Sequence, residues 1–208
     1  GCHKRGGHGV ENFEQGLQNS CNPVFMELAE SIGKEKFYKY FEAYGFMQKT
    51  GIDLAGEVSS IYHTDINGFN QTELAVYSFG QTFRITPIQL LAAECAVANG
   101  GNIVQPHVLK ALVDEDGNVV KEFETSVVRQ VNSEQTGKTI MQYLANGINL
   151  GSTKNAYVKG YSVAAKTGTS QKRDKEGNYY IGSCVAFAPA DDPQIAILIA
   201  IDEPVGEY

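Results

Sequence analysis

Residues 161 to 170 read Tyr161-Ser162-Val163-Ala164-Ala165-Lys166-Thr167-Gly168-Thr169-Ser170. The apolar and small side chains in this segment predict a β-strand that ends at the edge of a sheet. Two-residue periodicity places Lys166 on the same face as Ser162 and Ala164, whose small side chains leave room for a ligand beside the ammonium group.

The three residues after Lys166 add groups that suit an anionic ligand. Gly168 has no side chain to obstruct a substrate backbone, and Thr167 and Thr169 offer hydroxyl and N–H groups to a carboxylate or an oxyanion. A solvated lysine on an edge strand would also fit a tripeptide as short as Lys-Thr-Gly. This segment alone therefore does not indicate a catalytic site, and a second motif elsewhere in the chain would have to accompany it.

Ser20-Cys21-Asn22 is such a second motif. A short predicted helix with Phe13 and Leu17 on one face precedes it. Pro23 follows it, and proline is favoured in the first turn of a helix, so a second helix is predicted to begin there. A turn at this point would expose the Ser20 hydroxyl and the Asn22 amide. The alternative interpretation is that Ser20 only caps the second helix.

Ser-x-Asn followed by Lys-Thr-Gly is typical of serine acyl-transfer enzymes that react with penicillin. The chain resembles the transpeptidase domain of class B penicillin-binding proteins, the D,D-transpeptidases that cross-link peptidoglycan. The resemblance extends over nearly the whole length and rests on further segments, namely Gly7-His8-Gly9, Thr50-Gly51-Ile52-Asp53-Leu54, Gly56-Glu57, Phe79-Gly80-Gln81, Thr86-Pro87-Ile88-Gln89-Leu90, Ala98-Asn99-Gly100-Gly101 and Phe187-Ala188-Pro189-Ala190-Asp191-Asp192-Pro193. After Gly80-Gln81 the family pattern has Gly or Ser, where this chain has Thr82.

The resemblance implies an α/β (α+β) fold in which helices cover both faces of an antiparallel sheet. It also implies roles for six residues, with Ser20, Asn22 and Lys166 catalytic and Thr167, Gly168 and Thr169 binding the substrate. Ser20 would shuttle protons and Asn22 would hold the substrate amide. The expected ligands are peptidoglycan stem peptides ending in D-Ala-D-Ala, and the β-lactam antibiotics that mimic them. Acyl transfer of this kind requires no cofactor.

The family nucleophile, the serine of a Ser-x-x-Lys motif N-terminal to Ser-x-Asn, has no match in the first nineteen residues. Ser31-Ile32-Gly33-Lys34 has the right letters but ends a helix, so we interpret it as a chance match. We therefore expect residues 1–208 to be the C-terminal portion of one transpeptidase domain, truncated at both ends. The nucleophile and a membrane anchor would lie in the missing N-terminal part, which places the domain outside the cytoplasmic membrane among other cell-wall synthesis proteins.

Two other functions share these motifs. A serine β-lactamase has the same groups but also needs a base that activates water for deacylation. A non-catalytic, penicillin-binding-like scaffold would keep the fold without the nucleophile. Whether the intact protein acts in division, elongation or sporulation is not encoded in these residues.

The N-terminal loop contains a candidate metal site. Cys2, His3 and His8 offer a thiolate and two imidazoles, which are preferred zinc ligands. A fourth ligand would come from Cys21, Cys184, His63 or a carboxylate. The spacing matches no known zinc finger, so a purely structural role for these residues is the alternative.

Composition limits the class of protein. The net charge of −7 argues against a nucleic-acid partner, and 42% apolar with 20% charged residues is ordinary for a globular domain. The apolar run from Ile195 to Ile201 is too short to span a bilayer and predicts a buried inner strand, apolar on both faces. Four cysteines without paired spacing do not imply a disulfide framework.

Periodicity and capping signals predict the remaining elements. Thr86-Pro87-Ile88-Gln89 is a capping box with proline at the first helical position, and its apolar stripe would be Ile88, Leu91, Ala92 and Cys95. Asp114 to Asn118 marks a hairpin turn between two strands. Helices are predicted over 13–19, 23–32, 34–46, 73–79, 86–99 and 133–147, and strands over 104–113, 119–123, 161–170, 181–188 and 194–201.

Overall fold

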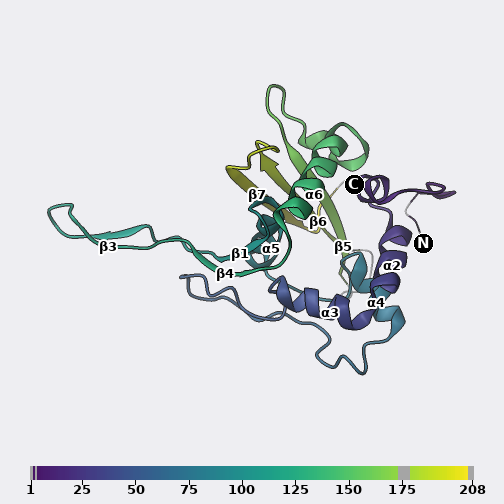
Figure 1. Cartoon of the computed structure of the whole chain (residues 1–208), viewed down its shortest axis with the longest axis horizontal. Helices are drawn as coiled ribbons and strands as arrows, with labels where there is room; N and C mark the ends of the chain where they lie inside the picture. Colours follow the sequence, from purple (N-terminus) through teal and green to yellow (C-terminus); the bar gives the residue numbers. More distant parts are fainter. Residues whose placement is uncertain (1, 3, 173–178, 206–208) are drawn as a thin grey trace.

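The computed structural model describes residues 2, 4–172 and 179–205. Helices pack around an antiparallel sheet, and a thin two-stranded arm extends away from the body (Figure 1). The predicted class of mixed helix and antiparallel sheet is confirmed. In the part of the chain that is described, no helix has the length and apolar character needed to cross a membrane.

The main sheet has three antiparallel strands in the order β5-β6-β7. These are β5 (Ala164–Gln171), β6 (Tyr180–Ala188) and β7 (Ile195–Asp202). Lys166 pairs with Val185 on β6, and Cys184 on β6 pairs with Ile199 on β7. The three adjacent strands agree with the prediction, although β5 begins at Ala164 and not at Tyr161. The connection between the predicted strands 161–170 and 181–188 lies mostly outside the described residues.

One face of this sheet forms the main core with two helices, α5 (Pro87–Ala98) and α6 (Glu134–Asn146). Val185 and Phe187 from β6 pack there against Met141 of α6. Ser133 caps α6, as its position before the helix predicts, by accepting the Thr136 N–H.

The opposite face of the sheet is covered at β5 and β6, where Cys184, Ala186 and Ala188 pack against one small apolar cluster. Two 3₁₀ helices, η1 (Gly147–Asn149) and η2 (Gly151–Ala156), lie there, and Ile148 packs against Ala165. At β7 the same face leaves four isoleucines 53–59% exposed, namely Ile195, Ile197, Ile199 and Ile201. The prediction of an inner strand covered on both sides therefore fails for the described residues, because β7 lies at the sheet edge.

α1 (Phe13–Gln18) packs against the main core through Leu17. A second core lies among α2 (Asn22–Ile32), α3 (Lys34–Ala43) and α4 (Gln71–Ser78). The predicted helix over 34–46 supplies aromatic packing to this core, since Phe41 of α3 lies 5.5 Å from Tyr77 and 5.0 Å from Phe83 between ring centroids. α4 begins earlier than predicted, because Asn70 and Glu73 form a reciprocal capping box.

α5 is joined to the loop after α3 through Gln89. Its side chain is 1% exposed, and its amide nitrogen donates to Gln48 O at 2.6 Å and Ser60 Oγ at 2.7 Å. The capping box with Thr86 is present as predicted. Leu91 and Cys95 of the predicted stripe pack against the main core, while the most buried positions of α5 are Gln89, Ala93 and Ala96.

The arm consists of two short ladders. β1 (Asn102–Gln105) pairs with β4 (Ser126–Gln130), and β2 (Ala111–Val113) pairs with β3 (Val119–Glu122). The Asp114 hairpin turn is confirmed, because its carboxylate accepts the N–H groups of Asp116 and Asn118. A single strand over 104–113 is wrong, because Pro106 has no N–H for a ladder and interrupts the run.

Candidate active site

Lys166 and Ser20 lie 146 positions apart in sequence and meet in space. The Lys166 ammonium donates one hydrogen bond to Ser20 Oγ and another, of 2.7 Å, to the carbonyl of Thr167. Asn22 opens α2 two residues after Ser20, with a partly buried side chain. The structure thus brings the turn before α2 to the edge of β5.

Ser20 is held in an unusual backbone conformation. Its φ of 49° lies in the left-handed region, which costs a non-glycine residue free energy. Hydrogen bonds on either side fix the turn, from Ser20 N to Leu17 O and from Cys21 N to Gly16 O. Cys21, not Ser20, is the N-cap of α2. The interpretation of Ser20 as a simple cap is therefore wrong, and its hydroxyl faces Lys166.

Ser31 lies elsewhere, in the last turn of α2, where its exposed hydroxyl donates to Leu28 O. A helix C-terminus presents carbonyl groups and negative potential, which do not activate a nucleophile. The interpretation of Ser31-Ile32-Gly33-Lys34 as a chance match agrees with this position.

Lys166 is mostly buried, and burial lowers the pKa of its ammonium, while Cys184 and Glu94 partly oppose this shift. Glu94 comes from α5, and burial raises the pKa of its carboxyl to about 7. One of its oxygens is buried and has no hydrogen-bond partner within the described residues. Sequence reasoning missed Glu94, although it is the one charged residue in the apolar helix Pro87–Ala98.

Thr169 exposes its backbone at the free edge of β5. Its carbonyl accepts a 3.2 Å hydrogen bond from the Gln81 side chain, which reaches across that edge. In a strand the N–H and C=O of one residue point to the same side, so the Thr169 N–H faces the edge as well. Gln81 precedes Thr82, the position at which this chain departs from the Gly or Ser of the family pattern. The φ of 69° at Thr82 shows why glycine suits that position.

Gly168 is exposed on β5, and its lack of a side chain also matters to the adjacent strand. A Cβ at this position would lie 2.8 Å from Ser183 Oγ on β6. The glycine therefore accommodates a neighbour on the adjacent strand, and the predicted clearance for a substrate backbone stays a prediction.

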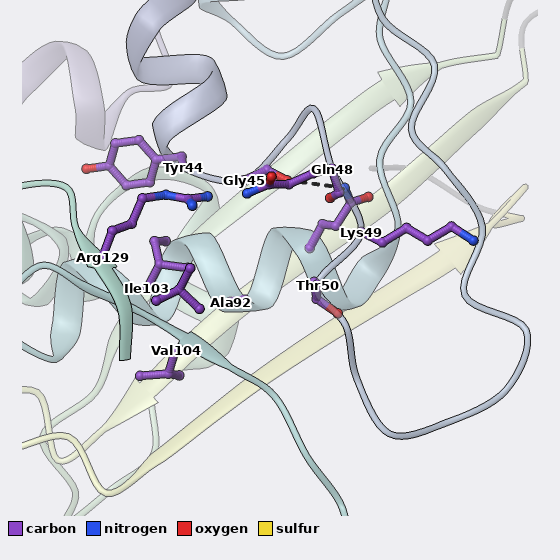
Figure 2. A pocket seen from close by; sticks show the side chains of 11 residues that line it. Tyr44, Gly45, Gln48, Lys49, Thr50, Ala92, Ile103, Val104 and Arg129 are labelled. Carbon is purple, nitrogen blue, oxygen red and sulfur yellow. Dashed lines mark hydrogen bonds between the residues drawn. The ribbon is translucent and has the colours of Figure 1, made fainter. Parts of the chain in front are cut away.

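The site is an open strand edge, and the hollows nearby are small. One cavity of about 10 Å³ adjoins Lys166 and Ala165 beneath α1 and α6. A larger hollow of about 60 Å³ lies between α5, β1 and the loop after α3, with Tyr44 and Arg129 at one end and Lys49 at the other (Figure 2). None of the predicted site residues in the described part of the chain lines the larger hollow, so it is separate from the Lys166 edge.

The N-terminal loop brings Cys2 and His8 to Cys21, and the ligand atoms of these three residues lie within 4.8 Å of one another. His3, which the sequence placed in this set, lies outside the described residues. Cys184 and His63 are elsewhere, on β6 and beside Glu73. Cys21 is thus the member of the predicted donors that joins the group, while burial and Glu11 raise the pKa of its thiol to about 11.

The strand edge with Lys166 and its Thr-Gly-Thr run contacts a serine from the turn before a helix. This arrangement is typical of serine acyl-transfer enzymes that react with penicillin. The chain belongs to the penicillin binding protein transpeptidase domain family, whose model matches residues 1–208. The predicted resemblance is confirmed.

Curated relatives agree with this assignment. The chain is 44% identical to Stage V sporulation protein D of Bacillus subtilis over 99% of its own length and 32% of the relative. It is 30% identical to peptidoglycan D,D-transpeptidase MrdA of Acinetobacter baumannii, over 94% of the chain and 32% of that relative. The chain therefore spans about a third of the length of these relatives.

Solved structures share the fold. Penicillin binding protein 3 from Mycobacterium tuberculosis complexed with aztreonam matches with a TM-score of 0.84 at 28% identity, over 94% of this chain and 46% of that one. The same protein complexed with ampicillin matches with a TM-score of 0.83 at 29% identity, over 93% and 45%.

Proposed function

We propose that residues 1–208 are the C-terminal portion of a peptidoglycan D,D-transpeptidase domain that cross-links stem peptides and is acylated by β-lactams. The hydrogen bond from Lys166 to Ser20 is the observation that carries this proposal, because it unites both family motifs at one strand edge. The complexes of a related penicillin binding protein with aztreonam and ampicillin support it.

The proposed reaction begins with a serine from a part of the protein outside these residues. Its oxygen bonds to the carbonyl carbon of the penultimate D-alanine, and the bond from that carbon to the terminal D-alanine nitrogen breaks. Ser20 relays the serine proton to the leaving amine, and Asn22 holds the substrate amide. An amine of a neighbouring stem peptide then displaces the serine and completes the cross-link.

The β5 edge would supply the electrostatics of this reaction. Thr167 and Thr169 hydroxyls bind the substrate carboxylate, and the buried Lys166 ammonium strengthens that binding in a medium of low dielectric constant. The Thr169 N–H is one of two oxyanion donors, and such a donor is worth about 10²–10³ in rate. These groups act without a cofactor.

We propose that the domain works outside the cytoplasmic membrane, held there by a segment outside residues 1–208. This location would give it access to peptidoglycan precursors and to other cell-wall synthesis proteins. The names of the curated relatives, a sporulation protein and a peptidoglycan D,D-transpeptidase among them, support a role in cell-wall synthesis.

The test uses the intact protein and a fluorescent penicillin. Lys166→Ala is expected to abolish labelling, whereas Lys138→Ala, which removes an exposed lysine paired with Glu134 on α6, should label normally. Both variants are checked for folding by thermal unfolding. Normal labelling of Lys166→Ala would contradict the proposal, and rapid release of a chromogenic cephalosporin would indicate a β-lactamase instead.

A further inference from the structure

The segment that leads into β5 carries an excess of positive charge. Residues 135–173 contain five lysines and one arginine but no aspartate or glutamate, although the whole chain has a net charge of −7. Lys154 and Lys159 lie just before β5, and both are exposed. Within the described residues, neither ammonium group forms an ion pair. These two cations are therefore available to an anionic ligand.

Exposed aromatic side chains alternate with these lysines. Tyr157 is 52% exposed and Tyr161 is 69% exposed. A tyrosine offers a large, amphipathic contact area at a small cost in conformational entropy. We refer to Lys154, Tyr157, Lys159 and Tyr161 together as the pre-β5 surface. Its combination of unpaired lysines and exposed rings suits a ligand that carries both carboxylates and apolar groups.

The pre-β5 surface is fixed beside Lys166. Thr153 of η2 is 5% exposed, and its hydroxyl donates to Gly147 O at 2.8 Å. Thr153 and Gly147 also line the small cavity that adjoins Lys166. A turn closed by the hydrogen bond from Tyr161 N to Val158 O, at 3.1 Å, then leads towards β5. Because Tyr161 lies five positions before Lys166, their Cα atoms are at most roughly 18 Å apart.

Two acidic residues lie near this end of β5. The Ala190 N–H donates to Ser162 O at 3.0 Å, which brings the exposed Asp191 and Asp192 towards the start of the strand. Neither carboxylate pairs with a lysine of the pre-β5 surface in the part of the chain that is described. The charge of this surface is thus not neutralised by a fixed ion pair.

The order of groups along β5 indicates which substrate would reach this surface. In the proposed reaction the acyl carbonyl oxygen lies on the Thr169 N–H, and the carboxylate of the leaving D-alanine lies towards Lys166 and Thr167. The acceptor amine attacks the carbon from which that D-alanine departed, and attack by an amine is the reverse of departure of an amine, so both amines occupy the same place. The acceptor therefore approaches from the N-terminal end of β5.

We propose that the pre-β5 surface binds the acceptor stem peptide, with its C-terminal carboxylate on Lys154 and Lys159 and its apolar parts on the two tyrosines. This inference rests on the proposed transpeptidase function. The neutral acceptor amine bonds to the acyl carbon, the bond from that carbon to the serine oxygen breaks, and an amine proton passes through Ser20 to that oxygen. Nearby positive charge favours the neutral form of the amine, which is the nucleophile.

The test measures acyl transfer by the intact protein from a thioester donor peptide to a soluble acceptor stem peptide with a free side-chain amine. The variant with both Lys154→Gln and Lys159→Gln should raise the KM for the acceptor by roughly 2- to 30-fold, as the loss of two exposed ion pairs predicts. The matched control combines Lys110→Gln with Lys121→Gln. It removes the same charge from exposed positions on the arm and should leave this KM unchanged (Figure 1).

Acylation by a fluorescent penicillin separates this proposal from the proposed function, because acylation uses no acceptor. Both double variants should be acylated at the wild-type rate, whereas a wild-type protein that is not labelled would contradict the transpeptidase function itself. An acceptor amidated at its C-terminus should have a raised KM with the wild-type protein and no further increase with the Lys154 and Lys159 variant.

Three results would overturn the proposal. The first is an unchanged acceptor KM in the Lys154 and Lys159 variant, and the second is an equal increase in the arm variant. The third is binding of the wild-type protein to vesicles of anionic lipid that this variant loses while its acceptor KM stays unchanged, since that result would assign the pre-β5 surface to a membrane.

Discussion

Ser20 combines a strained backbone with the hydroxyl that Lys166 contacts, and glycine and alanine substitutions separate these two properties. Both substitutions remove a hydrogen bond from an ammonium group, which is worth about 1.5–3 kcal/mol. Since each 1.36 kcal/mol corresponds to a tenfold change in rate, acylation should slow by about 10- to 150-fold in both variants if this bond forms in the transition state.

Stability should respond differently. A left-handed φ costs an L-residue about 1–2 kcal/mol, and glycine does not incur this cost. Ser20→Gly should therefore be more stable than Ser20→Ala by about 1 kcal/mol, or about 2–4 °C in Tm for a domain of this size.

The assay measures the second-order rate of acylation by a fluorescent penicillin and the Tm of the intact protein and of both variants. Ser31→Ala is the matched control, because Ser31 is exposed in the last turn of α2 and its hydroxyl donates to Leu28 O of the same helix. Acylation of Ser20→Ala within twofold of wild type would refute the role of the hydroxyl. A lower Tm for Ser20→Gly than for Ser20→Ala would refute the strain argument.

Two other substitutions test the helices that support the site. Burial raises the pKa of Glu94 from 4.5 to about 7, so the folded protein retains a proton that the unfolded chain releases. The free energy of unfolding should therefore fall by roughly 3 kcal/mol as the pH rises from about 4.5 to 7. Glu94→Gln removes that dependence, and its Tm should exceed the wild-type Tm by more at pH 8 than at pH 5; an equal difference at both pH values would count against it. A Cβ at Gly137 of α6 would lie 2.3 Å from the Val97 carbonyl of α5, so Gly137→Ala should cost about 1–3 kcal/mol in urea unfolding despite the better helix propensity of alanine. The control Gln135→Ala, on the exposed side of α6, should stay within about 0.5 kcal/mol of wild type in the free energy of unfolding. A Gly137→Ala variant as stable as wild type would contradict the prediction.

Local sequence signals predicted the helices whose capping residues directly precede them in sequence. Thr86 with Pro87, and Ser133 before α6, mark helix starts through side chains next to the helix itself. The ladder of β1 with β4 was missed because it joins Asn102 to Gln130 across the whole arm. No short window of sequence contains both partners of such a pair.

The same difference between local and long-range signals applies to the candidate site. The two motifs predicted that Ser20 and Lys166 belong to one site, because each motif is contiguous and specific when they occur together. Glu94 and Gln81 were not predicted to approach β5, since their proximity depends on how α5 and the preceding loop pack against the sheet. The backbone strain at Ser20 and Thr82 likewise appears only in three dimensions.

A crystal structure of the intact protein acylated by ampicillin is the most direct measurement of whether the β5 edge and the Ser20 turn form one reaction centre. We predict that the adduct lies along β5, with its carboxylate on the hydroxyls of Thr167 and Thr169 and its carbonyl oxygen on the Thr169 N–H. Ser20 should remain hydrogen-bonded to Lys166 beside it. An adduct bound away from β5, or a Ser20 hydroxyl turned away from Lys166 and the ligand, would contradict the assignment.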